Sequence, residues 1–355
     1  MIDQQALSHA IAEVASKWIE PTYPQRRSVV EDTLVLGNRF TEEAMSFAIN
    51  QQMSLLNEGA LLEWVNGRRV SDSQLIGVLN AGNIPLVGLQ DWLAVVLTGA
   101  GYRGVLSSKS PFFLPAFALD VVDLYPDLDM DFVEYDPLFD QVDAVIASGG
   151  DETIAAVREK CIENDLSEKQ CLLRGHRLSI ALLTGNEGAA DLENLAEDVL
   201  LHEGMGCRNV SIIWAPENVS PDPYLDAFAV FRSVFPVHTR TPGSLKMKQA
   251  FLAAVDTPHA YGEGMEFLVS KGAPEQQEPG HVRWAEYRTE KELISWIENH
   301  KDEIQLVLAN KHTLNRFKNI TELDIPDVLP LGDAQRPSLN WCADGIDTIA
   351  FLQAL

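Results

Sequence analysis

Short apolar segments of strand length alternate with segments of helical periodicity between residues 75 and 185, and this alternation constrains the fold more than any other feature of the chain. The expected strands are 75–80, 104–107, 144–147 and 178–184, and the expected helices between them are 86–97, 111–123 and 153–164. Strands that are apolar along their whole length are typical of a parallel sheet covered by helices on both faces. We therefore expect an α/β protein that binds its ligands at the carboxyl ends of these strands.

The segments on either side of this alternation indicate further layers. Residues 1–65 carry apolar side chains at helical spacing. Beyond residue 184 the pattern predicts helices at 191–202 and 222–235, strands at 210–214 and 282–287, and a helix that begins after Thr289. These changes of pattern predict a helical layer at 1–65, two α/β lobes at 66–184 and 185–323, and a tail at 324–355 that packs back on the core.

The charge and the cysteine content exclude several classes of protein. Acidic residues outnumber basic ones by 52 to 27, and the formal net charge of −25 repels nucleic acid and anionic lipid. No apolar run of about 18 residues is present to span a membrane, and the amino terminus lacks the apolar core of a signal peptide. The four cysteines form no C-x-x-C pair, so neither a zinc site nor a disulfide framework is predicted. We expect a reduced, cytoplasmic protein without a bound metal.

An anionic ligand would be repelled by the overall negative charge of the chain, so its site would need local positive charge or exposed backbone N–H groups. The basic residues that could supply the charge are Lys109, Arg174, Arg177 and Arg208. For the arginines, pairing with the many acidic side chains is the alternative.

The segment Gly99–Gly104 matches the dinucleotide-binding pattern G-x-G-x-x-G. That pattern requires a strand before it and a helix after it, whereas here the order of the two elements is reversed. We expect these glycines to end the helix 86–97 and to turn the chain, rather than to bind a phosphate group.

Cys207 lies between a predicted helix and a predicted strand, in the segment Gly-Met-Gly-Cys-Arg-Asn. Glycines allow the backbone of such a turn to approach a substrate closely, and Arg208 would help to stabilise a thiolate. A buried structural cysteine is the alternative, and it is the more common fate of this residue type. Cys161, Cys171 and Cys342 lie in helical or tail contexts without such neighbours, and we interpret them as structural.

Five short segments in a fixed order decide between these alternatives. They are Asn83 in Ala-Gly-Asn-Ile-Pro, Lys109 in Ser-Ser-Lys-Ser-Pro, the run Ser148-Gly149-Gly150-Asp151-Glu152, the run Arg174–Ser179, and Gly206-Cys207. The set covers most of residues 75–300 and resembles the acyl-CoA reductase family of the aldehyde dehydrogenase superfamily, whose best-known member supplies fatty aldehyde for bacterial bioluminescence. Each segment is unspecific alone, but their order and spacing together are specific.

The resemblance implies an aldehyde dehydrogenase-like fold, in which two Rossmann-like α/β lobes follow an N-terminal helical layer. Lobe 66–184 would bind a nicotinamide cofactor and lobe 185–323 would carry the catalytic cysteine. The resemblance assigns Cys207 as the nucleophile and Asn83 as a donor to the oxyanion. It assigns cofactor binding to Lys109, Ser148, Gly149 and Gly150.

Two departures from the family pattern are informative. Where hydrolytic aldehyde dehydrogenases carry a glutamate that activates water, this chain has Leu173, which favours thioester reduction over aldehyde oxidation. Where NAD-preferring relatives carry an acid three positions after the lysine, this chain has Phe112, which favours NADPH over NADH. The Glu-x-Phe-Gly-Pro segment of the dehydrogenases is not intact, and Glu278-Pro279-Gly280 is at most its remnant.

The expected reaction is the reduction of an acyl thioester, from coenzyme A or an acyl carrier protein, to an aldehyde. His176 and His202 are the candidate proton donors. An aldehyde dehydrogenase or an acyl-phosphate reductase with the same cysteine is the alternative within enzymes, and a non-reducing acyl-transfer or scaffold subunit is the alternative outside them. Association with a second copy, or with an acyl-activating partner, is also expected.

Overall fold

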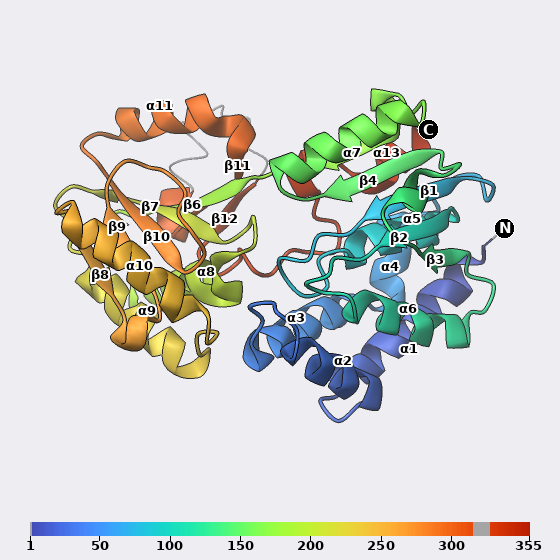
Figure 1. The fold of residues 1–355 in the computed structure, drawn as a ribbon, viewed down its shortest axis with the longest axis horizontal. Coiled ribbons are helices and arrows are strands. Elements are labelled where there is room, and N and C mark those ends of the chain that lie inside the picture. Colours follow the sequence, from blue (N-terminus) through green and yellow to red (C-terminus); the bar gives the residue numbers. More distant parts are fainter. Residues whose placement is uncertain (1, 315–326) are drawn as a thin grey trace. The chain divides into compact units, whose positions relative to one another are not determined.

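The computed structural model describes residues 2–314 and 327–355. The chain forms two compact units (Figure 1). Unit 1 comprises Met1–His176 and Ser338–Leu355, and unit 2 comprises Arg177–Pro337. Each unit contains its own sheet and its own buried core, and each is described separately below.

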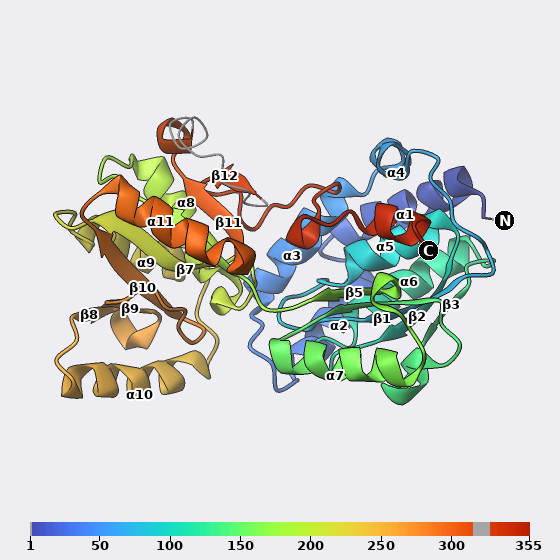
Figure 2. The same cartoon turned by 90° about the horizontal axis from the view of Figure 1, so that it is seen from above.

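Unit 1 is built on a parallel sheet with the strand order β3-β2-β1-β4-β5. Its strands are β1 (Leu75–Leu79), β2 (Gly101–Val105), β3 (Met130–Phe132), β4 (Ala144–Ser148) and β5 (Cys171–Arg174). The helices that connect them are α5 (Leu89–Thr98), α6 (Phe113–Leu124), η1 (Asp136–Phe139), α7 (Asp151–Glu163) and η2 (Glu168–Gln170). Helix α7 lies on one face of the sheet and α5 lies on the other (Figure 2). The covered, parallel sheet expected from the apolar strands is therefore confirmed.

The amino-terminal part of unit 1 is helical, as its periodicity predicts. Its helices are α1 (Gln4–Ile19), α2 (Pro24–Leu34), α3 (Glu42–Leu55) and α4 (Glu58–Val65). Helix α1 begins at Asp3, whose carboxylate accepts hydrogen bonds from two N–H groups of the first turn. Leu7, Ile11 and Trp18 form one buried stripe of this helix, and the Trp18 indole donates a hydrogen bond to Asp120 on α6 at 2.7 Å. The stripe fixes the helical layer against the sheet-covering helices of the same unit.

Unit 2 contains a second sheet with the strand order β12-β11-β6-β7-β10-β9-β8, parallel except for the antiparallel pair β8–β9. Its strands are β6 (Leu178–Leu182), β7 (Val210–Pro216), β8 (His259–Tyr261), β9 (Leu268–Lys271), β10 (His281–Tyr287), β11 (Ile304–Ala309) and β12 (Val328–Pro330). Its helices are α8 (Ala189–Leu200), η3 (Leu201–Gly204), α9 (Asp222–Val234), α10 (Thr241–Ala254), η4 (Glu263–Met265), α11 (Glu290–His300) and η5 (Lys301–Glu303).

The core of unit 2 has two parts, one on each face of its sheet. Ile213 packs in the cluster that includes Phe228 of α9, whereas its neighbour Ile212 packs in the cluster that includes Ile297 of α11. This alternation follows from the strand geometry, in which successive side chains point to opposite faces.

Three differences from the sequence-based expectations bear on the division of the units and on the candidate site. The division between the units falls after His176 rather than after Thr184, because Leu178–Leu182 pairs with β7 and β11 of unit 2. Strand β2 begins at Gly101, so only Gly99 of the segment Gly99–Gly104 ends a helix, with φ 97°. Strand β5 was not anticipated, and it contains Cys171.

The carboxyl-terminal segment returns to unit 1. Residues Ser338–Leu355 include η6 (Ala343–Gly345) and α13 (Thr348–Gln353), and α13 packs on α5. Two backbone carbonyls of this segment, at Leu339 and Trp341, accept hydrogen bonds from Gln90 of α5. The short helix α13 was not expected from the sequence.

Candidate active site

The candidate residues of unit 1 follow three neighbouring parallel strands. Asn83 follows β1, Lys109 follows β2, and Gly149 follows β4. The carboxyl ends of such strands meet at one edge of the sheet, so the three loops lie at the same edge. The loops after β1 and β2 touch at Gly82, because a Cβ atom placed there would lie 2.1 Å from the Ser107 Oγ. Only glycine allows this close approach.

The backbone of Lys109 is fixed while its side chain is exposed. Its N–H donates to the Ser107 Oγ at 3.3 Å, and its carbonyl accepts from the Asn38 amide at 3.1 Å. Within the described residues, the Lys109 ammonium forms no ion pair. Helix α6 begins four residues later without an acidic side chain in its first turn and without a side-chain cap. A lysine beside an uncapped helix N-terminus suits an anionic group.

The turn Ser148–Gly150 has similar properties. The Gly149 N–H donates to the Arg174 carbonyl at 3.1 Å, which holds the turn against the end of β5. Gly150 precedes α7 without a side-chain cap, and a Cβ atom placed there would meet nothing within 4 Å. The first-turn N–H groups of α7 are therefore accessible, although Asp151 and Glu152 add negative charge nearby. Together with Lys109, this edge fits the phosphate groups of a dinucleotide.

The arginine at the end of β5 has a structural role instead. One terminal nitrogen of Arg174 donates to both carboxylate oxygens of Asp91 on α5, at 2.9 and 2.8 Å, and both side chains are buried. Its other terminal nitrogen donates to the Thr348 hydroxyl at 2.7 Å. Arg174 is therefore paired with an acidic side chain and is not available to bind a ligand. Among the basic residues named from the sequence, Lys109 presents an exposed charge at this edge.

Cys207 is the exposed cysteine of the chain, whereas Cys161 is buried and Cys171 and Cys342 are half-buried. Its turn lies between η3 and β7. The Cys207 carbonyl accepts from the Ser179 hydroxyl at 2.8 Å, and the Gly206 N–H donates to the Asn209 side chain at 2.9 Å. These bonds hold the backbone of the turn, and the cysteine itself is exposed. The buried-cysteine alternative is therefore wrong for Cys207.

The approach to this turn is conformationally strained. His202, Glu203 and Gly204 have φ angles of 53°, 57° and 70°, in the left-handed region. Each non-glycine residue there costs about 1–3 kcal/mol and persists only where its surroundings hold it. The Glu203 carboxylate pairs with Arg232 at 3.2 Å inside the unit, and the Glu203 carbonyl accepts from the Gly280 N–H at 2.9 Å.

Two buried charged side chains fix the segment 332–334 beside the turn. Arg208 donates to the carbonyls of Ala334 at 2.5 Å and Asp333 at 3.2 Å. Asp198 accepts from the N–H groups of Gly332 at 2.7 Å and Ala334 at 3.1 Å. Burial lowers the pKa of Arg208 to about 10, opposed chiefly by the negative charge of Cys207. Arg208 is therefore close enough to favour the thiolate form of the cysteine.

The two candidate proton donors differ in their environment. Burial lowers the pKa of His202 to about 4, so the ring is neutral at pH 7 and does not suit the role of an acid. His176 is exposed, and its backbone N–H, not its ring, donates to the Asp151 carboxylate at 2.9 Å. Among the residues that the structure describes, no cluster of His, Cys, Asp and Glu could hold a metal ion. In the same part of the chain, no helix has the length and apolarity to cross a bilayer.

Solved structures with this fold are numerous, and their sequences differ strongly from this one. An oxidoreductase from Marinobacter aquaeolei superposes with a TM-score of 0.75 at 12% identity, covering 99% of this chain and 83% of that one. The NAD+ complex of an aldehyde dehydrogenase from Bacillus cereus gives 0.70 at 13% identity, covering 93% and 76%. An NAD-dependent benzaldehyde dehydrogenase from Corynebacterium glutamicum gives 0.70 at 14% identity, covering 94% and 83%. The fold is therefore that of the aldehyde dehydrogenases.

The sequence match is narrower and more specific. Residues 72–220 match the family described as acyl-CoA reductase (LuxC), and no curated protein matches the chain. The matched range contains Asn83, Lys109, Ser148–Gly150 and Cys207. The resemblance of this range to the acyl-CoA reductases is thus confirmed, and it lies in a chain whose fold is that of the aldehyde dehydrogenases.

Sequence reasoning missed the buried charges around Cys207. Asp198 and Arg232 lie on the helices α8 and α9, and exposed polar residues such as Glu193 and Ser233 lie within a few positions of them. The only available signal was position, since Asp198 lies three residues, about one helical turn, after the apolar Leu195.

Proposed function

We propose that the protein reduces an acyl thioester, donated by coenzyme A or an acyl carrier protein, to an aldehyde, with Cys207 as the residue that accepts the acyl group. The observation that carries this proposal is the exposed Cys207 thiol on a fixed turn inside the segment that matches the acyl-CoA reductase family. A structural cysteine would have no need of a strained approach fixed by a buried ion pair.

In the first stage the Cys207 thiolate attacks the thioester carbonyl and a new carbon–sulfur bond forms. The negative charge on the carbonyl oxygen is stabilised by hydrogen bonds from the Asn83 amide and the Cys207 backbone N–H, the roles that the resemblance assigns to them. The bond to the departing thiol then breaks, and that thiolate takes a proton from solvent. Arg208 favours the ionised cysteine that this stage requires.

Lys109, Ser148, Gly149 and Gly150 would hold a nicotinamide cofactor, which when bound supplies the hydride that converts the acyl group on Cys207 to the aldehyde. Three of the similar structures carry NAD in their descriptions, two as bound complexes and one as a dependence. We favour NADPH over NADH, because the exposed Lys109 and the absence of an acid in the first turn of α6 suit a 2′-phosphate.

Leu173 supports reduction over aldehyde oxidation. It is the third residue of β5 and is half-buried beside Ala147 of β4. A leucine cannot accept a proton from water, so it cannot serve as the base that hydrolysis of an acyl-enzyme requires. An aldehyde dehydrogenase or an acyl-phosphate reductase with the same cysteine, or a subunit that transfers the acyl group without reducing it, remains the alternative that product analysis distinguishes.

The test is to incubate the purified protein with a series of acyl-CoA thioesters and either NADPH or NADH, and to measure aldehyde formation. We expect aldehyde from the wild-type protein and none from Cys207→Ser. Cys342→Ser is the matched control, because this half-buried cysteine lies outside the matched range and should keep full activity. Full aldehyde formation by Cys207→Ser would overturn the assignment, and acyl transfer without aldehyde would favour the non-reducing alternative.

A further inference from the structure

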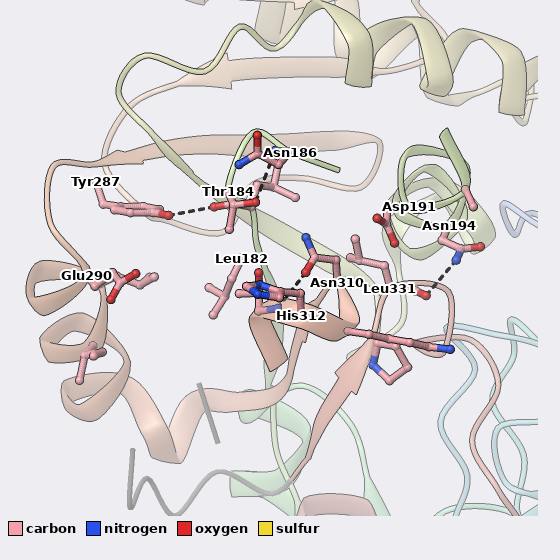
Figure 3. A pocket seen from close by; sticks show the side chains of 17 residues that line it. Leu182, Thr184, Asn186, Asp191, Asn194, Tyr287, Glu290, Asn310, His312 and Leu331 are labelled. Carbon is pink, nitrogen blue, oxygen red and sulfur yellow. Dashed lines mark hydrogen bonds between the residues drawn. The ribbon is translucent and has the colours of Figure 1, made fainter. Parts of the chain in front are cut away.

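Unit 2 contains a cavity of about 730 Å³ that the proposed reaction does not use (Figure 3). Its walls come from the carboxyl ends of β6, β10, β11 and β12, where Leu182, Tyr287, Asn310 and Leu331 line it. Ligand sites in proteins typically have volumes of about 300–1,000 Å³. The carboxyl edge of a parallel sheet is also where α/β folds usually bind ligands.

This cavity and Cys207 lie at opposite ends of the same sheet. Cys207 precedes β7, which runs parallel to β6 and β10, so it lies at the amino ends of these strands. The seven residues of β7 span roughly 20 Å at about 3.3 Å per residue. A ligand in the cavity therefore cannot contact the reacting cysteine.

The groups that would bind an anion at this edge are already occupied. Glu187 accepts hydrogen bonds from the N–H groups of Thr184 at 2.8 Å and Gly185 at 2.9 Å. Asp191 accepts from the N–H of Gly188, just before α8, at 3.1 Å. Because carboxylates of the chain hold the places that a phosphate would take, they would repel one.

A cation is also disfavoured. The Glu187 carboxylate accepts further hydrogen bonds from the hydroxyl of Tyr224 at 2.5 Å and from the Asn310 amide at 3.2 Å. Its oxygens therefore have little capacity left for a cation. Lys311 lines the cavity and would repel a second positive charge. Among the described residues no set of carboxylates and imidazoles converges here as a metal site requires.

The remaining lining suits hydroxyl groups attached to an apolar face. Thr184 is largely occupied, because its hydroxyl donates to Glu187 at 3.0 Å and accepts from the Asn186 backbone N–H at 3.4 Å. The Asn194 amide donates one hydrogen bond to the Leu331 carbonyl at 3.1 Å, which leaves its second N–H and its oxygen for a ligand. The Asn186 side chain offers a further amide that both donates and accepts. Leu182 and Leu331 supply apolar surface, and the Tyr287 side chain is held at the wall by its hydrogen bond to the Leu183 carbonyl at 2.9 Å. Sugars combine hydroxyl rims with C–H faces of this kind.

We propose that this cavity is a second binding site, for an uncharged sugar or a similar polyhydroxylated molecule. The proposal is independent of the reaction at Cys207, because no residue of that reaction lines the cavity. A bound ligand would stand between the strand ends and the first turns of α8 and α11, where Asp191 and Glu290 lie.

The test uses the full chain and ligand-observed NMR with maltose and glucose, with glucose 6-phosphate and glucosamine as matched charged probes. Two variants at the exposed start of α8 distinguish the cavity from other surfaces. Ala190→Phe places a phenyl ring in the cavity, because Ala190 lines it. Ala189→Phe adds the same side chain at the preceding residue, which does not line the cavity. Both should keep the wild-type melting temperature.

We expect maltose or glucose to bind more tightly than either charged probe. Ala190→Phe should weaken this binding at least roughly tenfold, and Ala189→Phe should leave it unchanged. Tighter binding of glucose 6-phosphate or glucosamine that Ala190→Phe removes would overturn the choice of an uncharged ligand. Absence of binding by all four probes at about 10 mM, or binding that is insensitive to Ala190→Phe, would overturn the site.

Discussion

Replacing Arg232 by methionine tests whether the buried ion pair behind Cys207 stabilises unit 2. The Arg232 and Glu203 side chains are only 2% and 3% exposed, and their nearest charged atoms are 3.2 Å apart. Methionine retains much of the apolar contact of the arginine stem but leaves the Glu203 carboxylate without a positive partner. The variant therefore removes the charge with little change in packing.

Breaking one side of a buried pair costs about 3–5 kcal/mol, because the remaining charge stays in a low-dielectric interior. The left-handed backbone at Glu203, worth about 1–3 kcal/mol of strain, would lose part of what holds it. The double variant Glu203→Gln/Arg232→Met removes both charges, and it should recover at least half of the loss.

The assay is urea unfolding followed by circular dichroism, together with the rate at which iodoacetamide alkylates Cys207. Arg232→Met should lower the free energy of unfolding of unit 2 and change the alkylation rate, since the turn becomes less constrained. Arg288→Met is the matched control, because the Arg288–Glu217 pair is exposed and should contribute little. If Arg232→Met proved no more destabilising than Arg288→Met, the role we give to the buried pair would be refuted.

Three further outcomes follow from the same structure. Burial raises the pKa of Asp198 from 3.8 to about 7, so the folded state holds a proton that the unfolded state has lost in this window. Stability should fall by up to about 1.4 kcal/mol per pH unit as pH rises from about 4 to 7; Asp198→Asn should flatten this slope in melting curves, and an unchanged slope would contradict the assignment. Gly82→Ala should destabilise unit 1 by about 1–3 kcal/mol in thermal unfolding, since its Cβ would overlap Ser107, and an unaltered melting temperature would show that the loops adjust freely. Lys109→Met should weaken NADPH binding more than NADH binding in fluorescence titrations, and an equal effect on both would speak against a 2′-phosphate contact.

Within residues 75–165 the sequence predicted β1, β2, β4 and the helices α5, α6 and α7, because buried parallel strands are apolar throughout and their helices are long enough to show periodicity. It missed β3, which is only three residues long. It placed Leu178–Leu182 in the wrong sheet because an apolar run identifies a strand but not its hydrogen-bonded neighbours. Strand β5 was missed because Cys171–Arg174 is short and ends in a charged residue whose partner, Asp91, is distant in sequence.

The positions of the candidate cofactor residues could be predicted because the topology dictates them. Once β1, β2 and β4 are parallel neighbours, the residues that follow them must meet at one edge. The exposure of Cys207 could not be predicted, since it depends on the left-handed turn at His202 and Glu203 and on Ser179, which lies far from it in sequence. The cavity of unit 2 is likewise formed by four strand ends whose order one sequence does not reveal.

The central claim is that the acyl group is carried on Cys207, and mass spectrometry of the protein after incubation with an acyl-CoA, without cofactor, tests it most directly. We predict that the mass of one acyl group is added and that peptide mapping places it on Cys207. Subsequent addition of NADPH should remove the adduct and release the aldehyde. Aldehyde formation without any acyl adduct, or with the adduct on Cys161, Cys171 or Cys342 instead, would contradict the account.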